Sequence, residues 1–279
     1  MENLRDPPRT PAGFTLDAFC GTAEHYLRYR LPYPRALLED LLARVGALEA
    51  DRMLDLGCGP GRIALELAAR FRDVWAIDVE PEMVEVGRAE AQRRMICNVR
   101  WMVAAVEGAD VPAASFDLIT IGEAFHRFQQ REILRRTLKW LRPGGALAIM
   151  GADGVINGVA PWQRAAQEVV RRFSDRPSPS GPAPAEDIAQ NEALLRTAGF
   201  VDVVDCGFPI EHEWTTECVA GHLYSTSYCS RAVLGGRAPE FEAELAAALL
   251  ASDPAGRYRQ LVRFGYTFAR KPLCTEEGG

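Results

Sequence analysis

The chain has 279 residues, of which 48% are hydrophobic and 25% charged, and its formal net charge is −6. This composition is ordinary for a folded globular protein, so disorder is not the default interpretation. Lys and Arg are scattered and form no basic block, which disfavours nucleic acid as the main partner because phosphate binding needs clustered positive charge.

The seven cysteines are odd in number and widely spaced, and no CxxC pair occurs. We therefore expect reduced thiols, with neither a disulfide framework nor a metal site. No uncharged apolar run reaches the ~18 residues that a membrane helix needs, and the charged, proline-rich N-terminus has no apolar signal region. These patterns predict a cytoplasmic protein without a membrane partner, and they leave its oligomeric state open.

The first 50 residues predict an arm followed by two helices. Residues 1–13 are expected to be flexible. Pro32 and Pro34 interrupt a helical pattern between Leu16 and Leu48, which predicts a short helix, a rigid turn and a helix over 34–45.

From Asp51 onward, short apolar segments alternate with helical ones, a pattern typical of a parallel sheet covered on both faces. We expect strands over 53–56, 74–77, 99–103, 116–121 and 146–150. We expect helices over 61–70, 81–94 and 132–141, with a turn over 142–145 before the fifth strand.

The alternation loosens after Gly151. Residues 175–185 are rich in Pro and Ser and predict a mobile loop. Residues 187–198 predict a helix that stops at Gly199, a residue that suits a helix C-terminus. Further strands are expected over 201–209 and 261–271, and further helices over 216–224 and 239–250.

The first strand runs directly into Gly57-Cys58-Gly59-Pro60-Gly61. Glycines are needed where the backbone turns sharply and a ligand approaches it closely, and the following helix would point its free amides at the turn. A dinucleotide fingerprint requires G-x-G-x-x-G, but Arg62 occupies the place of the last glycine. About 20 residues on, Asp78 ends the second strand, where an acidic side chain suits the hydroxyls of a ribose. Together these features predict an adenosine site at the carboxyl ends of the first two strands.

Four segments in this order resemble the class I S-adenosylmethionine-dependent methyltransferase family: 54–61 (LDLGCGPG), 78–83 (DVEPEM), 115–119 (SFDLI) and 140–147 (WLRPGGAL). The resemblance covers roughly residues 50–150. It implies an α/β fold with a doubly wound, mostly parallel seven-stranded sheet, the Rossmann-like methyltransferase fold, in which one strand near the C-terminus is antiparallel. It also implies a helical lid and cap.

The resemblance further implies S-adenosylmethionine as the cofactor and a set of residues that bind it. Asp55 would steady the turn and the amino-acid end of the cofactor. Residues 19–34 are similar to the lid of the small-molecule branch, in which a Tyr and an Arg lie over the cofactor near its carboxylate. Tyr26, Tyr29 and Arg30 are the matching positions. The remaining positions implied to bind the cofactor are Gly57, Cys58, Gly59, Gly61, Asp78, Val79, Met83, Val106 and Glu107.

One position departs from the family's pattern. The loop after the third strand commonly carries an Asp that bonds the adenine amino group. Here Ala105 takes that place and lacks the carboxylate, although backbone groups of Val106 remain available to adenine.

Glu123 and His126 follow the fourth strand, where the methyl group of the cofactor should lie. A His there could take a proton from a hydroxyl or amine nucleophile, and Glu123 is a second candidate for the catalytic residue. In many relatives this His shapes the pocket instead. The family often has a Trp after the His, and Arg127 replaces it here.

Two other groups of residues have plainer explanations. Glu211, His212 and Glu213 could bind a metal or a cation, but in an extended segment the two carboxylates take one face and the His takes the other. A solvated strand end is the preferred interpretation. The aromatic residues Trp162, Trp214, Tyr224 and Tyr228 could line an acceptor pocket, but they are more typical of core.

The sequence thus predicts an S-adenosylmethionine-dependent methyltransferase that methylates oxygen or nitrogen of a small molecule, such as a natural product or sugar of secondary metabolism. Residues 1–50 would form the arm and lid helices, 51–151 the cofactor-binding α/β core, and 152–279 the rest of the sheet with an acceptor-binding cap. A nicotinamide-dependent oxidoreductase and a non-catalytic S-adenosylmethionine-binding partner subunit remain alternatives.

Overall fold

The computed structural model describes residues 19–46, 51–176 and 185–273. Within these residues, strands form a seven-stranded sheet in the order β3-β2-β1-β4-β5-β7-β6. Neighbours among β1 to β5 pair in parallel, whereas β7 runs antiparallel to both β5 and β6. This is the predicted doubly wound sheet with its antiparallel strand near the C-terminus. The strands are β1 (Arg52–Leu56), β2 (Asp73–Asp78), β3 (Val99–Val103), β4 (Phe116–Gly122), β5 (Leu141–Ala152), β6 (Val201–Thr215) and β7 (Arg257–Arg270).

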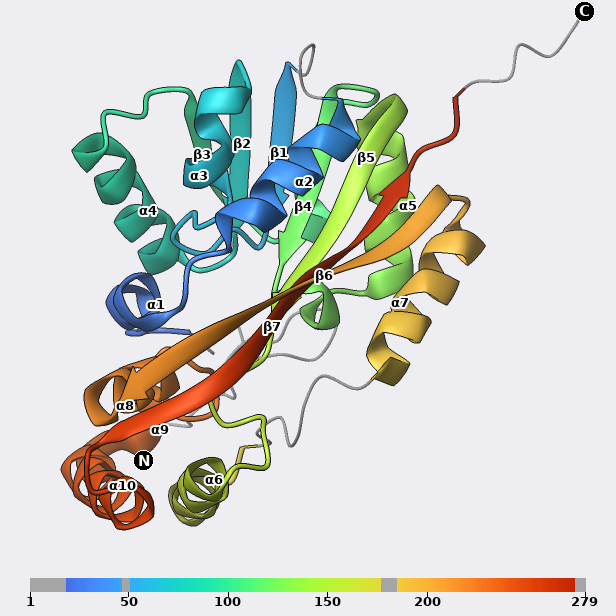
Figure 1. The fold of residues 1–279 in the computed structure, drawn as a ribbon. Coiled ribbons are helices and arrows are strands. Elements are labelled where there is room, and N and C mark those ends of the chain that lie inside the picture. The colour runs from blue at the N-terminus through green and yellow to red at the C-terminus, as the bar shows by residue number, and fades with distance from the viewer. Residues whose placement is uncertain (1–18, 47–50, 177–184, 274–279) are drawn as a thin grey trace, which may run out of the picture.

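Helices cover both faces of the sheet (Figure 1). One face packs on α2 (Arg35–Val45) and α3 (Ala64–Leu67), and the other on α5 (Gln130–Trp140) and α7 (Ala185–Ala198), so the apolar core is divided into two clusters. Helix α4 (Pro81–Arg93) lies beside β2 and β3. None of the helices in the described ranges is both long and apolar enough to span a bilayer.

The remaining helices gather at the end of the sheet where the carboxyl ends of the parallel strands lie (Figure 1). They are α1 (Ala23–Tyr29), α6 (Pro161–Phe173), α8 (Thr216–Tyr224), α9 (Arg231–Leu234) and α10 (Ala238–Ser252). Helices α6, α8, α9 and α10 surround the far ends of β6 and β7, which extend well beyond the other strands, and α1 contacts α8. We call α1 the lid and α6 with α8 to α10 the cap.

The burial of the strands explains why the sequence reveals the central ones most clearly. Residues 116–121 of β4 are all buried, as expected for a strand covered on both faces. Residues 207–213 of β6 instead alternate between exposed and half-buried, before the buried Trp214. This part of the strand lacks a continuous apolar pattern, and the predicted strand 201–209 therefore stops six residues short of Thr215.

Four other expectations about the elements need correction. The helix expected over 61–70 is only α3 followed by a 3-10 turn, Ala68–Arg70, because Gly61 adopts a left-handed conformation at φ +82° and cannot belong to a helix. The turn expected over 142–145 lies within β5, as an irregularity in its pairing with β4. Strand β7 begins four residues before the predicted 261–271, and α6 and α9 were not predicted. The arm 1–13 and most of the loop 175–185 fall outside the described residues.

Trp101 of β3 is held between two glycines. A Cβ atom added at Gly61 would lie 2.4 Å from the Trp101 ring, and one added at Gly87 of α4 would lie 2.5 Å from it. The absence of side chains at these two positions therefore lets the indole fill the space between the glycine turn and α4.

We predict that Gly61→Ala lowers the free energy of unfolding by about 2 to 4 kcal/mol, because it adds a clash with the indole to the cost of a left-handed alanine. Urea unfolding measures this loss. Gly236→Ala is the matched control, since a Cβ there meets no atom within 4 Å. Equal stability of the two variants would contradict the proposed packing role.

Candidate active site

A cavity lies at the carboxyl ends of β1, β2 and β4. The chain crosses from β1 to β2 on one side and from β4 to β5 on the other, so this is the point at which the strand order reverses. Open α/β sheets bind ligands at such points. The cavity is lined by Phe19, Tyr26, Gly57, Gly59, Asp78, Val79, Glu80, Met83, Ala105, Val106, Glu107, Gly122, Glu123, Ala124, Arg127 and Phe128.

The glycine turn forms the floor of this cavity. Gly57 and Gly59 have φ values of +64° and +53°, which favour glycine over any residue with a Cβ. A Cβ added at Gly57 would lie 2.7 Å from the Cβ of Ala124, so β1 and the segment after β4 touch at this point. A Cβ added at Gly59 would have no atom nearer than 4.0 Å. The first glycine therefore permits close packing, and the second leaves backbone facing open space.

Asp78 joins the glycine turn to the end of β2. One carboxylate oxygen accepts a hydrogen bond from the Gly59 amide at 2.7 Å, and the other accepts one from the Glu80 amide at 2.9 Å. Burial raises the pKa of Asp78 above its usual value, and these backbone bonds oppose the shift. Each carboxylate oxygen has a further lone pair. The side chain can therefore hold the turn and still accept hydrogen bonds from ligand hydroxyls.

Asp55 lies beneath the turn and is fully buried. Its carboxylate accepts hydrogen bonds from the Thr120 hydroxyl of β4 at 2.6 Å and from the Ala64 amide at the start of α3 at 3.2 Å. It thereby ties β1 to β4 and to the helix after the turn. Burial raises the pKa of Asp55 to about 7, against the effect of these two bonds.

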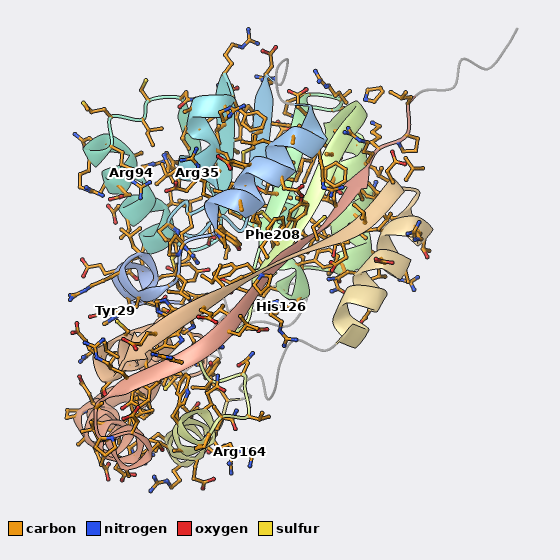
Figure 2. The ribbon with its side chains drawn as sticks, in the orientation of Figure 1. Tyr29, Arg35, Arg94, His126, Arg164 and Phe208 are labelled. Carbon is orange, nitrogen blue, oxygen red and sulfur yellow. The ribbon has the colours of Figure 1, made fainter. Side chains whose placement is uncertain are left out.

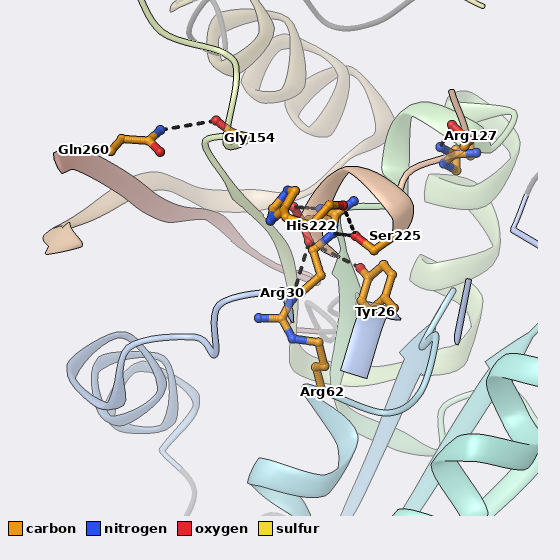
Figure 3. A network of polar contacts seen from close by, with 10 residues as sticks. Tyr26, Arg30, Arg62, Arg127, Gly154, His222, Ser225 and Gln260 are labelled. Atoms are coloured by element: carbon orange, nitrogen blue, oxygen red, sulfur yellow. Dashed lines mark hydrogen bonds and ion pairs between the residues drawn. The ribbon is translucent and has the colours of Figure 1, made fainter. Parts of the chain in front are cut away.

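Glu123 lies at the end of β4 and is bonded to the lid. Its carboxylate accepts hydrogen bonds from the Tyr26 hydroxyl at 3.3 Å and from Arg30 Nη1 at 3.2 Å, and Arg62 Nη1 lies 3.7 Å away. Arg30 also donates to the Ser225 hydroxyl of the cap at 2.8 Å. Figure 3 shows Arg30, Arg62 and Tyr26 grouped at this junction. Glu123 has φ +52°, a strained conformation for a side chain of this kind and a feature that concentrates at functional sites.

Another part of the wall comes from the loop after β3. Ala105, Val106 and Glu107 line it, and Val106 begins the 3-10 turn Val106–Gly108. Glu107 Oε1 is buried and has no hydrogen-bond partner among the residues that the structure describes. A buried acceptor without a partner is costly, so this oxygen is suited to a donor on a bound ligand.

Phe19, Arg127 and Phe128 also line the cavity, although they are not among the predicted site residues. Arg127 donates to the Ser227 hydroxyl of the cap at 3.1 Å and lies over the Phe19 ring, with its guanidinium carbon 4.4 Å from the ring centroid. Burial lowers the pKa of Arg127 to about 10. In the sequence, Arg127 stands where the family often has a Trp. That replacement indicated that the wall of the pocket differs from the family's, but it did not indicate a contact with the cap.

Six of the predicted site residues do not line the cavity. Arg30, Asp55 and Cys58 lie behind its wall or floor, and Gly61 faces Trp101. Tyr29 packs on Gly221 of α8 and donates to Glu217 at 2.9 Å, and Figure 2 shows it on α1. His126 is exposed, in the 3-10 turn Phe125–Arg127. The other predicted residues are among those that line the cavity: Tyr26, Gly57, Gly59, Asp78, Val79, Met83, Val106, Glu107 and Glu123.

The two groups with plainer explanations lie away from the cavity. Glu213 is exposed and pairs with Arg257, whereas the His212 ring lies on the other face of β6, 4.6 Å from that of Trp214. In the part of the chain that the structure describes, no three His, Cys, Asp or Glu side chains are arranged to hold a metal. Trp162, Trp214, Tyr224 and Tyr228 are buried in the core cluster.

Residues 53–145 match the family described as "Methyltransferase domain". YcgJ of Bacillus subtilis, named an uncharacterized methyltransferase, is 30% identical over 165 residues, which cover 58% of this chain and 62% of YcgJ. An uncharacterized methyltransferase of Mycobacterium tuberculosis is 33% identical over 112 residues, which cover 39% of this chain and 55% of that protein. The matches thus cover 62% and 55% of the length of these two relatives.

Solved structures are similar over more of the chain. The crystal structure of YcgJ superposes with a TM-score of 0.57 at 16% identity, covering 86% of this chain and 99% of that one. A phosphoethanolamine N-methyltransferase of Haemonchus contortus, solved with S-adenosylhomocysteine, gives a TM-score of 0.53 at 17% identity, covering 90% of this chain and 57% of that one. At such identities the likeness shows the fold alone.

We predict that Asp55→Asn flattens the dependence of stability on pH. The folded protein keeps the Asp55 proton up to a pKa of about 7, whereas an unfolded Asp loses it near pH 4. Between these values the native state binds more protons, so the contribution of Asp55 to stability falls as pH rises and is constant above about pH 7. Urea unfolding at several pH values measures the difference between the wild type and the variant. Parallel stability curves for the two proteins would contradict the shift.

Proposed function

Because the chain contains a class I S-adenosylmethionine-dependent methyltransferase domain, we propose that it transfers a methyl group from S-adenosylmethionine to a small-molecule acceptor. The observation that carries this proposal is the cavity at the carboxyl ends of β1 and β2, where the glycine turn meets the carboxylate of Asp78. Glycine backbone beside an acidic residue at the end of the second strand is the arrangement that suits an adenosine.

The chemistry of the cavity fits each part of the cofactor. We propose that Asp78 accepts hydrogen bonds from the ribose hydroxyls, while the turn from Gly57 through Cys58 and Gly59 to Gly61 presents backbone to the homocysteine portion. Val79, Met83 and Val106 would flank the adenine. Tyr26 and Arg30 would close the lid over the amino-acid end, with Asp55 holding the turn from below. Tyr29 would act indirectly, by docking the lid on α8.

S-Adenosylmethionine supplies an activated methyl group on a sulfonium, so the protein needs to align the acceptor and exclude water. Of the two residues predicted to be catalytic, Glu123 lines the cavity and His126 does not. We therefore favour Glu123 as the residue that orients an acceptor hydroxyl or amine, with its carboxylate held in place by Arg30. A role for His126 stays a prediction.

The acceptor is proposed to be small because the sequence has no basic block of the kind that binds nucleic acid. The same proposal includes methylation of oxygen or nitrogen, a role in secondary metabolism and a cytoplasmic location. It also includes an acceptor-binding cap over 152–279. The names of the curated relatives do not specify an acceptor.

Two alternatives predict different ligands or products. A nicotinamide-dependent oxidoreductase would need glycine where Arg62 stands. A protein that binds the cofactor without transferring its methyl group would retain the cavity. Neither alternative releases S-adenosylhomocysteine when an acceptor is added. Measuring its release with a panel of acceptors therefore separates methyl transfer from both alternatives.

Asp78→Asn is predicted to weaken binding of S-adenosylhomocysteine by about tenfold or more, because hydrogen bonds to a charged acceptor contribute about 1.5–3 kcal/mol each. Isothermal titration calorimetry measures this change. Asp73→Asn is the matched control, since Asp73 lies at the other end of β2, where it pairs with Arg52. Unchanged affinity in Asp78→Asn would contradict the ribose assignment.

Glu107 is proposed to accept a hydrogen bond from the adenine 6-amino group, the role that Ala105 cannot fill. We predict that wild type prefers S-adenosylhomocysteine over S-inosylhomocysteine, whose 6-carbonyl group is an acceptor. Glu107→Gln should reduce this preference about tenfold, because an amide can donate to the carbonyl. Calorimetry with both ligands gives the ratio. An unchanged ratio in Glu107→Gln would contradict the assignment. In the double variant Glu107→Ala/Ala105→Asp, a recovered preference for S-adenosylhomocysteine would support it.

A further inference from the structure

Arg127 brings a cation to the wall of the cavity, at the position where the family often has a Trp. It ends the 3-10 turn Phe125–Arg127 and is thereby fixed to the segment that follows β4. Its Nη2 atom donates to the Ser227 hydroxyl of the cap at 3.1 Å, and its guanidinium carbon lies 4.4 Å from the centroid of the Phe19 ring. The guanidinium is therefore held between the sheet, the cap and the aromatic ring just before the lid.

The charges along the cavity wall make Arg127 distinctive. It is the only cation among the cavity-lining side chains that the structure describes, and the other charged ones are the carboxylates of Asp78, Glu80, Glu107 and Glu123. Asp78 and Glu107 are the residues proposed to meet adenosine, and Glu123 accepts a hydrogen bond from Arg30. Arg127 is therefore the lining group with which this cavity can attract an anion.

The surroundings of Arg127 favour such an anion. Burial lowers the pKa of Arg127 to about 10, although the carboxylates of Asp78 and Glu123 act in the other direction. The side chain is still charged at neutral pH, because this pKa lies well above 7. A hydrogen bond from a charged donor to an anion is strengthened where water is partly excluded. An anionic ligand group would thus offset part of the cost of burying this guanidinium.

Arg127 is also separate from the arginine of the lid. Figure 3 shows Arg127 set apart from Arg30. Arg30 bonds to Glu123 at the end of β4, whereas Arg127 bonds to Ser227 of the cap. The cap is the part of the chain proposed to bind the acceptor. A molecule that reaches from Glu123 toward the cap would therefore meet the guanidinium of Arg127.

We propose that Arg127 binds an anionic group, a carboxylate or a phosphate, of the methyl acceptor. This inference rests on the proposed function and names the chemical class of its acceptor. An arginine carries five N–H donors in a fixed fork, so its bond to Ser227 leaves it able to bind an anion. Phe19 and Phe128 would flank the carbon skeleton of the acceptor, while Glu123 orients the hydroxyl or amine that receives the methyl group.

The test compares two probes of similar shape that differ in charge. Benzoate and benzamide are each titrated into the full chain saturated with S-adenosylhomocysteine, and calorimetry measures the affinities. We expect the wild type to bind benzoate about tenfold more tightly than benzamide, and Arg127→Gln to lose this preference. Arg127→Lys keeps the charge but loses the fork, so it should keep only part of the preference. Phenylphosphonate in place of benzoate shows whether the site favours a phosphate-like group or a carboxylate.

Two controls separate this role from a structural one. Arg131→Gln removes an exposed arginine of α5 and should leave the preference for benzoate unchanged. Ser227→Ala removes the hydroxyl that accepts from Arg127 but retains the charge, so it should lower the preference by less than Arg127→Gln does. Thermal unfolding reports the stability of each variant, and Arg127→Lys provides the comparison if Arg127→Gln folds poorly.

Equal affinity of the wild type for benzoate and benzamide, or no binding of either, would overturn the assignment of Arg127 while leaving the proposed function intact. A preference that persists undiminished in Arg127→Gln or Arg127→Lys would also overturn it. Failure of the wild-type chain to bind S-adenosylhomocysteine would instead contradict the proposed function itself.

Discussion

The site depends on one steric constraint: at the end of β1 the backbone must turn against β4 with no side chain between them. Gly57 meets this constraint, since a Cβ there would collide with that of Ala124. The contact brings the ends of β1, β2 and β4 together. Asp55 supports it from below by accepting a hydrogen bond from Thr120. Asp78 supports it from the side by accepting one from the backbone of the turn. The cavity exists because the chain turns away at this point of reversal in the sheet.

Electrostatics then link the sheet to the elements that cover it. Glu123 emerges from β4 in a strained conformation and bonds to Tyr26 and Arg30 of the lid, and Arg30 continues to Ser225 of the cap. Lid, sheet and cap therefore meet at one carboxylate. Arg62 Nη1 lies 3.7 Å from the same carboxylate, and the wall around Glu107 carries a buried acceptor.

The features that were predictable from the sequence are those determined by neighbouring residues. The glycine turn, the acidic end of β2, the buried central strands and helix α8 each leave a local pattern, and each lies where it was expected. Other features depend on contacts distant in sequence. The environment of Arg62 requires Tyr26 from the lid and Glu123 from β4, and Arg127 reaches the cap through Ser227. The extended ends of β6 and β7 depend on packing against cap helices rather than on alternation alone.

The central claim is that this cavity binds the adenosine and amino-acid portions of S-adenosylmethionine rather than a dinucleotide. Calorimetric titration of the full chain with S-adenosylhomocysteine and, separately, with NADH tests it most directly. The account predicts saturable binding of S-adenosylhomocysteine and no heat of binding for NADH. Binding of NADH with no response to S-adenosylhomocysteine would contradict it.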